Sequence, residues 1–319
     1  MIRALSGVVL IACATGAIGL AAQQQPIFQG EGDTVRVFVT VTDKDGRLVT
    51  ALSRDDFEIR DNGRPQPIAI FDNGSQPIQL VVMLDVSGSM QGNLPLLRQG
   101  ASHLFAALGP GDRARVGTFG REITISPAFT SDPTVLSAGL PTSIAPDAPT
   151  PLWRGIDHAM AAFDEQDTAR RVVLVLSDGR DSGSFSLGQR PVSQAQVIDE
   201  ARDQDVMVYA IGMRSRGPRS PMTSIGPGSL QSTLAADLPD PGLARVAEET
   251  GGGYLELRAS EDLGAAFAQV ADELHRQYLI GYAVPDRDGK VHDIDVRVST
   301  KGLKPRARKD YVAPRVATR

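Results

Sequence analysis

The middle of the chain alternates between short, continuously apolar runs and longer segments in which apolar residues recur every three or four positions. The runs predict buried strands over residues 78–85, 115–119, 171–177, 206–212 and 253–257. The longer segments predict helices over residues 94–108, 152–163, 192–204, 243–250 and 262–276. Strands that alternate with helices in this way are typical of a parallel sheet covered on both faces. We therefore predict a doubly wound α/β domain over residues 78–276.

Both ends of the chain show a different pattern, the strict alternation of half-buried strands. The inward-facing positions near the N-terminal end are Val35, Val37, Val39 and Val41. Those near the C-terminal end are Ile294, Val296 and Val298. A β unit of about 45 residues is too small to bury a core alone. We therefore predict that residues 26–76 and 277–315 pair into one discontinuous antiparallel β domain, into which the α/β domain is inserted.

The first 22 residues have the layout of a secretory signal peptide. Arg3 supplies the positive charge, residues 4–20 are apolar or small, and small residues up to Ala22 precede a polar run. A membrane anchor needs roughly 20 strongly apolar residues, whereas this stretch is diluted by Gly, Ala, Ser and Thr. We expect cleavage near Ala22, a periplasmic or secreted protein, and no membrane span in the mature chain. A retained anchor is the alternative.

The chain has one cysteine, Cys13, and it lies inside this leader. A single cysteine excludes an internal disulfide framework and a structural zinc site built from cysteines. Residues 10–13 also resemble a bacterial lipobox, in which Cys13 would carry a lipid anchor. Because the apolar run continues well beyond Cys13, we favour cleavage and keep lipidation as the alternative.

The length of the chain indicates the number of domains, and its charge indicates which class of partner is excluded. The 319 residues suggest about two domains at roughly 150 residues each. There are 33 Lys and Arg against 38 Asp and Glu, a formal net charge of −5. A nucleic-acid-binding domain normally shows a basic face. We therefore expect no nucleic-acid partner.

Oxygen-bearing side chains follow two of the buried strands at the points where these strands end. Asp85, Ser87 and Ser89 follow the first strand, Asp178 follows the third, and Thr150 stands just before a predicted helix. In an open α/β sheet, ligands bind beyond the carboxyl ends of the strands. Carboxylates and hydroxyls are hard ligands that suit Mg²⁺ or Mn²⁺. Helix capping is the alternative role for the two serines.

Residues 78–276 resemble the von Willebrand factor type A (VWA) domain, whose metal-ion-dependent adhesion site combines Asp-x-Ser-x-Ser with a Thr and an Asp from two further loops. The resemblance assigns metal ligation to Asp85, Ser87, Ser89, Thr150 and Asp178. It implies that the bound ion captures an Asp or Glu side chain of a protein partner. The terminal segments further resemble an exported bacterial VWA-related family that is abundant in acidobacteria.

Two features of the chain bear on this expected site. Pro149 and Pro151 flank the threonine where VWA relatives usually carry Gly and Ala, which we expect to stiffen the loop. A segment rich in Gly, Pro, Ser and Arg, residues 214–232, follows the fourth strand. Its arginines are Arg214, Arg216 and Arg219. They would steer an acidic partner towards the metal, or else belong to a solvated loop.

The sequence lacks the motifs of common enzymes. It contains no Gly-x-Ser-x-Gly elbow and no phosphate-binding Gly-x-x-x-x-Gly-Lys loop. A phosphatase of the haloacid dehalogenase type would need an Asp where Ser87 stands. The histidines have no metal-ligand spacing and are expected to be ordinary helix or strand residues: His103, His158, His275 and His292. We expect a metal-dependent protein-binding module rather than an enzyme, with a metal-independent scaffold of the cell envelope as the alternative.

Overall fold

The structure is a computed structural model that describes residues 34–164, 167, 169–182, 191–214, 239–258 and 262–316. The predicted signal peptide, residues 1–22 with Cys13, lies outside these residues, as do Arg216 and Arg219. Within the described ranges, no helix has the length and apolar character needed to cross a membrane.

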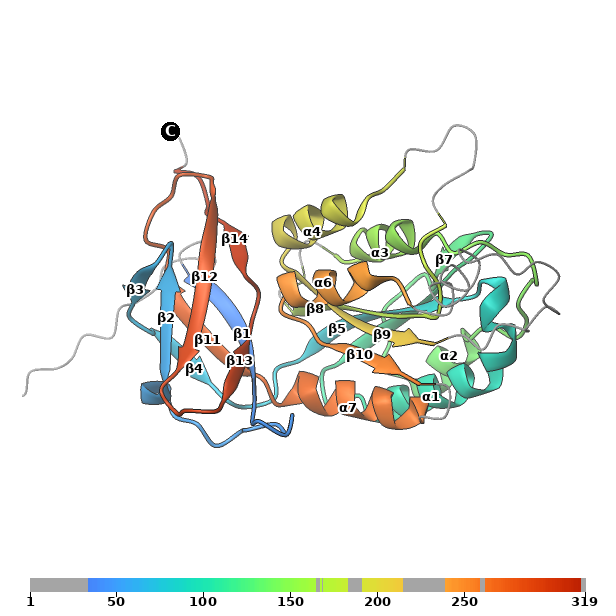
Figure 1. Ribbon diagram of the computed structural model, residues 1–319, viewed down its shortest axis with the longest axis horizontal. Coiled ribbons are helices and arrows are strands. Elements are labelled where there is room, and N and C mark those ends of the chain that lie inside the picture. Colours follow the sequence, from blue (N-terminus) through green and yellow to red (C-terminus); the bar gives the residue numbers. More distant parts are fainter. Residues whose placement is uncertain are drawn as a thin grey trace, which may run out of the picture.

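A six-stranded sheet forms the centre of the larger unit, with the strand order β10-β9-β8-β5-β6-β7 (Figure 1). All neighbours in the sheet are parallel except β7, which is antiparallel to β6. The strands are β5 (Ile78–Asp85), β6 (Arg113–Phe119), β7 (Ile123–Ile125), β8 (Arg170–Ser177), β9 (Val206–Met213) and β10 (Tyr254–Leu257). Every residue of β5 and β9 is buried, which explains why these strands are apolar without alternation.

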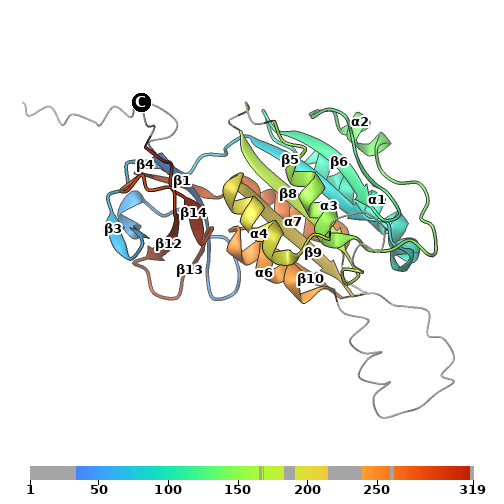
Figure 2. The ribbon, with the colours of Figure 1, turned by 90° about the horizontal axis from the view of Figure 1, so that it is seen from above.

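Helices cover both faces of this sheet (Figure 2). One face packs against α1 (Leu94–Ala106), α2 (Pro133–Ala138) and α7 (Leu263–His275). The other packs against α3 (Leu152–Met160), α4 (Gln194–Asp203) and α6 (Pro241–Glu249). Successive residues of β5 serve the two cores in turn, since Leu80 belongs to the first and Val81 to the second. The predicted doubly wound, mostly parallel α/β fold is thus confirmed.

Two four-stranded antiparallel sheets form the smaller unit, in the orders β13-β1-β11-β4 and β14-β12-β2-β3. Their strands are β1 (Thr34–Thr42), β2 (Phe57–Asp61), β3 (Arg64–Gln66), β4 (Ile70–Asp72), β11 (Tyr278–Ala283), β12 (Val291–Val298), β13 (Lys304–Arg306) and β14 (Asp310–Val312). A 3₁₀ turn, η2 (Arg54–Asp56), precedes β2.

Each of these sheets combines strands from both ends of the chain. Val37 of β1 is opposite Ile280 of β11, and Ile59 of β2 is opposite Val296 of β12. Inward-facing side chains of both sheets fill a single apolar core. We propose on these pairings that residues 26–76 and 277–315 fold as one domain around residues 78–276.

Several short elements have no counterpart in the predicted pattern, among them β7, α2 and β13. Each has only three to six residues, whereas hydrophobic periodicity needs a longer window to be recognised. The two strands form because a longer neighbour supplies hydrogen-bond partners, as β6 does for β7 and β1 does for β13. Helix α2 begins at a cap, where the Asp132 side chain accepts the backbone N–H of Thr134.

Candidate metal centre

The loop after β5 brings three of the predicted ligands together. Asp85 ends the strand fully buried, and its Oδ1 accepts the backbone N–H of Ser87 at 2.8 Å. Ser87 precedes a 3₁₀ helix, η3 (Gly88–Asn93), yet its side chain makes no capping hydrogen bond. The Ser87 hydroxyl instead lies 3.1 Å from that of Ser89. Helix capping therefore does not explain the position of the Ser87 hydroxyl.

The end of β8 carries Asp178 to the same place, because β8 lies beside β5 in the sheet. The Ser89 hydroxyl donates to Asp178 Oδ1 at 2.7 Å. The second oxygen, Oδ2, is buried and has no hydrogen-bond partner in the described part of the chain. A buried acceptor without a partner costs about 1–3 kcal/mol. A divalent cation beside Asp178 Oδ2 would supply that partner.

Thr150 reaches this group from the loop before α3. Its hydroxyl would lie 3.1 Å from a β-carbon added at Gly179, so it stands directly against the residue that follows Asp178. The loop is held in place from two sides: Thr150 N–H donates to the Ser182 hydroxyl at 2.9 Å, and Ser182 N–H donates to the Thr150 carbonyl at 2.9 Å. The five predicted ligands thus lie at one edge of the sheet.

Sequence reasoning missed two serines that position this group. Ser177, the last residue of β8, donates its hydroxyl to Oδ2 of Asp85. Both oxygens of Asp85 are therefore engaged, whereas Asp178 keeps one oxygen free. Ser182 holds the Thr150 loop as described above. The available signal was the clustering of hydroxyl residues around Asp178 in the sequence.

Both carboxyl groups are in surroundings that favour a nearby cation. Burial raises the pKa of Asp85 to about 7, and the negative charge of Asp178 adds to this, although hydrogen bonds from Ser177 and Ser87 act in the opposite direction. Burial also raises the pKa of Asp178, against the hydrogen bond from Ser89. A cation would favour the ionised form of both groups, since opposite charge lowers a carboxyl pKa.

The donor set consists of two carboxylates and three neutral hydroxyls. In the ranges that the structure describes, no three His, Cys, Asp or Glu side chains gather as a metal site, so the hydroxyls are needed to complete this donor set. The set contains only oxygen donors, which fits Mg²⁺ or Mn²⁺ better than a soft metal. The residues present therefore fit a hard divalent cation.

Gly88 is required by the close approach of the two loops. A β-carbon at this position would lie 2.0 Å from the Pro146 carbonyl oxygen, and Gly88 N–H donates to the Ala148 carbonyl at 3.1 Å. We expect Gly88→Ala to push the loops apart and to cost about 1–3 kcal/mol of unfolding free energy in a urea titration. Gly92→Ala is the matched control, because nothing lies within 4 Å of its added β-carbon. Equal stability of the two variants would contradict this account.

The arginines predicted to face a partner are only partly described. Arg214 follows β9 at the same edge of the sheet, but it forms an ion pair with Glu256 at 2.6 Å. Its charge is therefore largely balanced within the protein. Arg216 and Arg219 lie outside the described residues, and their proposed steering role stays a prediction.

Comparisons with known proteins identify the family of the α/β unit. The family model of the von Willebrand factor type A domain matches residues 79–241, half of the chain. No curated protein matches the sequence.

Solved structures with a similar fold include a von Willebrand factor type A protein from Catenulispora acidiphila. Its sequence is 12% identical, the match covers 89% of this chain and 75% of that chain, and the TM-score is 0.48. An aerotolerance-related membrane protein from Bacteroides fragilis shows 16% identity over 62% of this chain and 98% of that chain, with a TM-score of 0.45. Proximal thread matrix protein 1 from the mussel byssus, with a zinc-occupied MIDAS motif, shows 15% identity over 68% of this chain and 50% of that chain, with a TM-score of 0.46. On the match of the family model, this chain belongs to the von Willebrand factor type A domain family.

Proposed function

We propose that this chain is an exported, metal-dependent protein-binding module. In this proposal Asp85, Ser87, Ser89, Thr150 and Asp178 hold Mg²⁺ or Mn²⁺, and the ion captures an Asp or Glu side chain of a protein partner. The observation that carries the proposal is the buried Oδ2 of Asp178, which has no hydrogen-bond partner among the described residues. It lies in a group that already contains three neutral oxygen donors.

The charge balance of the donor set supports capture of an anion. Hydroxyl ligands bring no negative charge, so most of the field of the cation remains available to an incoming carboxylate. Asp85 already accepts hydrogen bonds at both oxygens, which suits it to orient the loop. The bound ion would supply the electrostatic attraction, while the hydroxyls of Ser87 and Ser89 would hold it at the sheet edge.

Export is supported by the leader pattern of residues 1–22, which lies outside the described residues. We propose cleavage near Ala22, with lipidation at Cys13 as the alternative, and membership of the exported bacterial VWA-related family. A binding role rather than a catalytic one is supported by the absence of a nucleophile elbow or phosphate loop from the sequence.

A metal-independent scaffold is the second candidate function. One observation favours it: Ser87, Ser89 and Asp178 already form a chain of close contacts at 3.1 and 2.7 Å. A scaffold would keep these hydrogen bonds permanently and would bind its partner equally well without a cation.

A metal-dependent capture assay separates the two functions. The mature protein is first titrated with Mg²⁺, Mn²⁺ and Zn²⁺ in a calorimeter. It is then immobilised and exposed to envelope proteins in Mg²⁺ or in EDTA. We expect saturable binding of Mg²⁺ or Mn²⁺ and partner capture only in the metal. Absence of metal binding, or equal capture in EDTA, would reject the metal-dependent function, and the latter result would favour the scaffold.

The affinity for Mg²⁺ should depend on pH through Asp85. The pKa of this carboxyl is raised from 3.8 to about 7, so below pH 7 a proton occupies it in the folded protein and competes with the metal. We expect affinity to fall by up to about tenfold per pH unit below pH 7 and to level off above pH 8. The Ser177 hydrogen bond lowers the pKa of Asp85, so Ser177→Ala should move this transition to higher pH. A flat calorimetric profile from pH 5.5 to 8 would contradict the assignment.

A further inference from the structure

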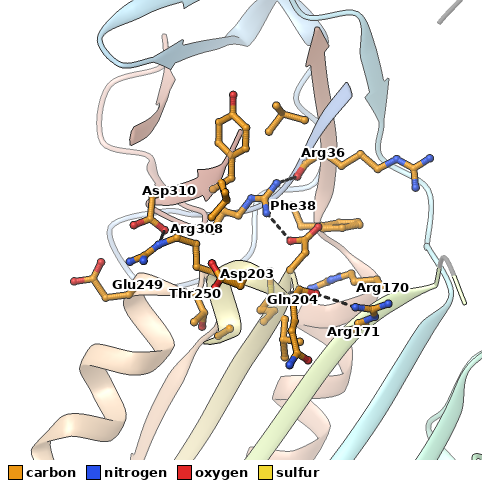
Figure 3. Close-up of a pocket in the computed structure, with 18 of the residues that line it drawn as sticks. Arg36, Phe38, Arg170, Arg171, Asp203, Gln204, Glu249, Thr250, Arg308 and Asp310 are labelled. Carbon is orange, nitrogen blue, oxygen red and sulfur yellow. Dashed lines mark hydrogen bonds and ion pairs between the residues drawn. The ribbon is translucent and has the colours of Figure 1, made fainter. Parts of the chain in front are cut away.

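A cavity of about 430 Å³ lies between the α/β unit and the β unit (Figure 3). Its walls come from the starts of β8 and β9, the end of α4, and from β1 and β14. The candidate metal centre lies at the other end of β8, so the two sites are about 26 Å apart at a rise of about 3.3 Å per residue. The volume falls within the range of small-molecule sites. The cavity is therefore a separate feature that the proposed function does not use.

Arg170, the first residue of β8, is a buried arginine in the wall of this cavity, with 8% of its surface exposed. Its guanidinium stacks on the Phe38 ring at 4.3 Å and donates to the Leu274 carbonyl at 3.2 Å and to the Gln277 side chain. These partners are neutral. Within the described residues, no carboxylate forms an ion pair with Arg170.

An unpaired charge in this position is costly to the folded protein. Buried charges are normally paired, because transfer of an ion from water into the protein interior is strongly unfavourable. Burial lowers the pKa of Arg170 to about 10, although Tyr209, Asp205 and Asp112 act in the opposite direction. A negative group in the cavity would offset this cost.

Among the described residues, the carboxylates that line the cavity form no ion pair with Arg170, although the charge of Asp205 attracts it from a greater distance. Asp205 pairs with Arg308 at 2.6 Å, and Asp310 pairs with Arg202 at 2.8 Å. Figure 3 shows Glu249 and Asp310 on one side of the cavity and Phe38, Arg170 and Arg171 on the other. The side of the cavity that carries these two arginines is its basic side, and Asp167, which accepts hydrogen bonds from Gln79 and Ala169, also lines the cavity.

The lining of this basic side is also partly apolar. Phe38 and Met207 line the cavity beside Arg170, and the sulfur of Met207 lies 3.0 Å from its guanidinium. Arg171, the next residue of β8, donates to the Gln204 carbonyl at 3.0 Å and is only half-buried. Arg170 thus lies next to an aromatic ring and a thioether, and Arg171 lines the same cavity.

We propose that this cavity binds a small organic anion. Its carboxylate or phosphate lies against Arg170 and Arg171, and its apolar part packs on Phe38 and Met207. Such a ligand would contact both units at once. Its binding is independent of the metal centre.

Titrations of the intact mature protein with benzoate and with phenyl phosphate test this proposal, with benzyl alcohol as the neutral probe at equal ionic strength. We expect a saturable calorimetric signal and a saturable rise in the melting temperature with at least one of the two anions, and none with benzyl alcohol. Arg170→Gln and Arg171→Gln should each weaken binding at least tenfold. Arg297→Gln is the matched control, because Arg297 lies on β12, pairs with Asp295 and does not line the cavity.

Each outcome of these titrations decides for or against the anion site. If Arg170→Gln does not fold, Arg171→Gln decides, since Arg171 is half-exposed. Equal binding of benzyl alcohol, absence of a saturable response to both anions, or unchanged affinity in Arg171→Gln would overturn the proposal and leave Arg170 as a structural contact between the units. Unchanged anion binding in Asp178→Asn is expected, and separates this test from failure of the metal-dependent function.

Discussion

Asp178→Asn is expected to abolish Mg²⁺ binding, with a loss of affinity of at least about 100-fold in a calorimetric titration. Changes in the groups that merely orient metal ligands already cost about 10–100-fold, and a direct ligand should cost more. Asparagine keeps the shape of Asp178 and can keep the contact with Ser89, but it removes the negative charge. It can also place an N–H₂ group where the unpartnered Oδ2 now lies.

The controls for this variant separate a specific site from general charge. Glu122→Gln removes an exposed carboxylate just beyond the end of β6, at the same edge of the sheet, and should leave the affinity unchanged. Ser89→Ala removes a neutral donor and should give an intermediate loss. If Asp178→Asn binds Mg²⁺ as the wild type does, Asp178 is not a ligand and the proposed function loses its main support.

Asp61→Ala is expected to destabilise the protein by about 3–5 kcal/mol, the range for removal of one partner of a buried ion pair. Asp61 ends β2 and is 2% exposed. One of its oxygens accepts the hydroxyls of Tyr282 at 2.9 Å and Tyr311 at 2.8 Å, and the other lies 2.7 Å from Nδ1 of His292. Removal of the carboxylate leaves three buried groups without their acceptor.

Urea unfolding followed by circular dichroism measures this loss. Asp295→Ala is the matched control, since Asp295 lies on β12, pairs with Arg297 and is 49% exposed. Exposed pairs of this kind contribute about 0–1 kcal/mol. A loss below about 1 kcal/mol for Asp61→Ala would show that the surrounding hydroxyls find other partners.

The same cluster makes stability depend on pH through His292. Burial alone would lower the pKa of His292, but the hydrogen bond and charge of Asp61, followed by those of Asp288, raise it. A raised folded pKa means that protonated His292 stabilises the fold fully below about pH 6.5. This contribution is lost as the pH rises through the folded value. In Asp61→Ala this pH dependence should weaken, because only Asp288 then opposes the effect of burial on His292.

The junction between the two units is polar as well as apolar. Glu273 of α7 accepts hydrogen bonds from Thr40 of β1 at 3.1 Å and from Tyr209 of β9 at 2.6 Å, and it pairs with Arg306 of β13. Gln277 also donates to Thr40, at 2.6 Å. These contacts join the β unit to both the sheet and a helix of the α/β unit.

The sequence alone determined the central architecture and the candidate metal ligands. A strand buried on both faces must be continuously apolar, so β5, β8 and β9 are visible as local runs. Parallel strands deliver their carboxyl ends to one edge, so residues that follow two neighbouring strands meet there. This is why Asp85 and Asp178 could be placed together from their positions in the chain.

Only the tertiary structure decided which polar groups have partners. His292 looked like an ordinary strand residue, yet it meets Asp61, which lies 231 positions earlier in the chain. Within the described residues, the unpartnered Oδ2 of Asp178 and the lack of an ion pair at Arg170 depend on neighbours from several elements. A buried strand can be recognised from its own apolar residues. The partner of a buried charge, in contrast, depends on the register and packing of segments that are distant in the sequence. The sequence by itself therefore determined where the candidate metal ligands lie, and the tertiary packing decided which buried charged groups lack a charged or hydrogen-bonding partner among the described residues.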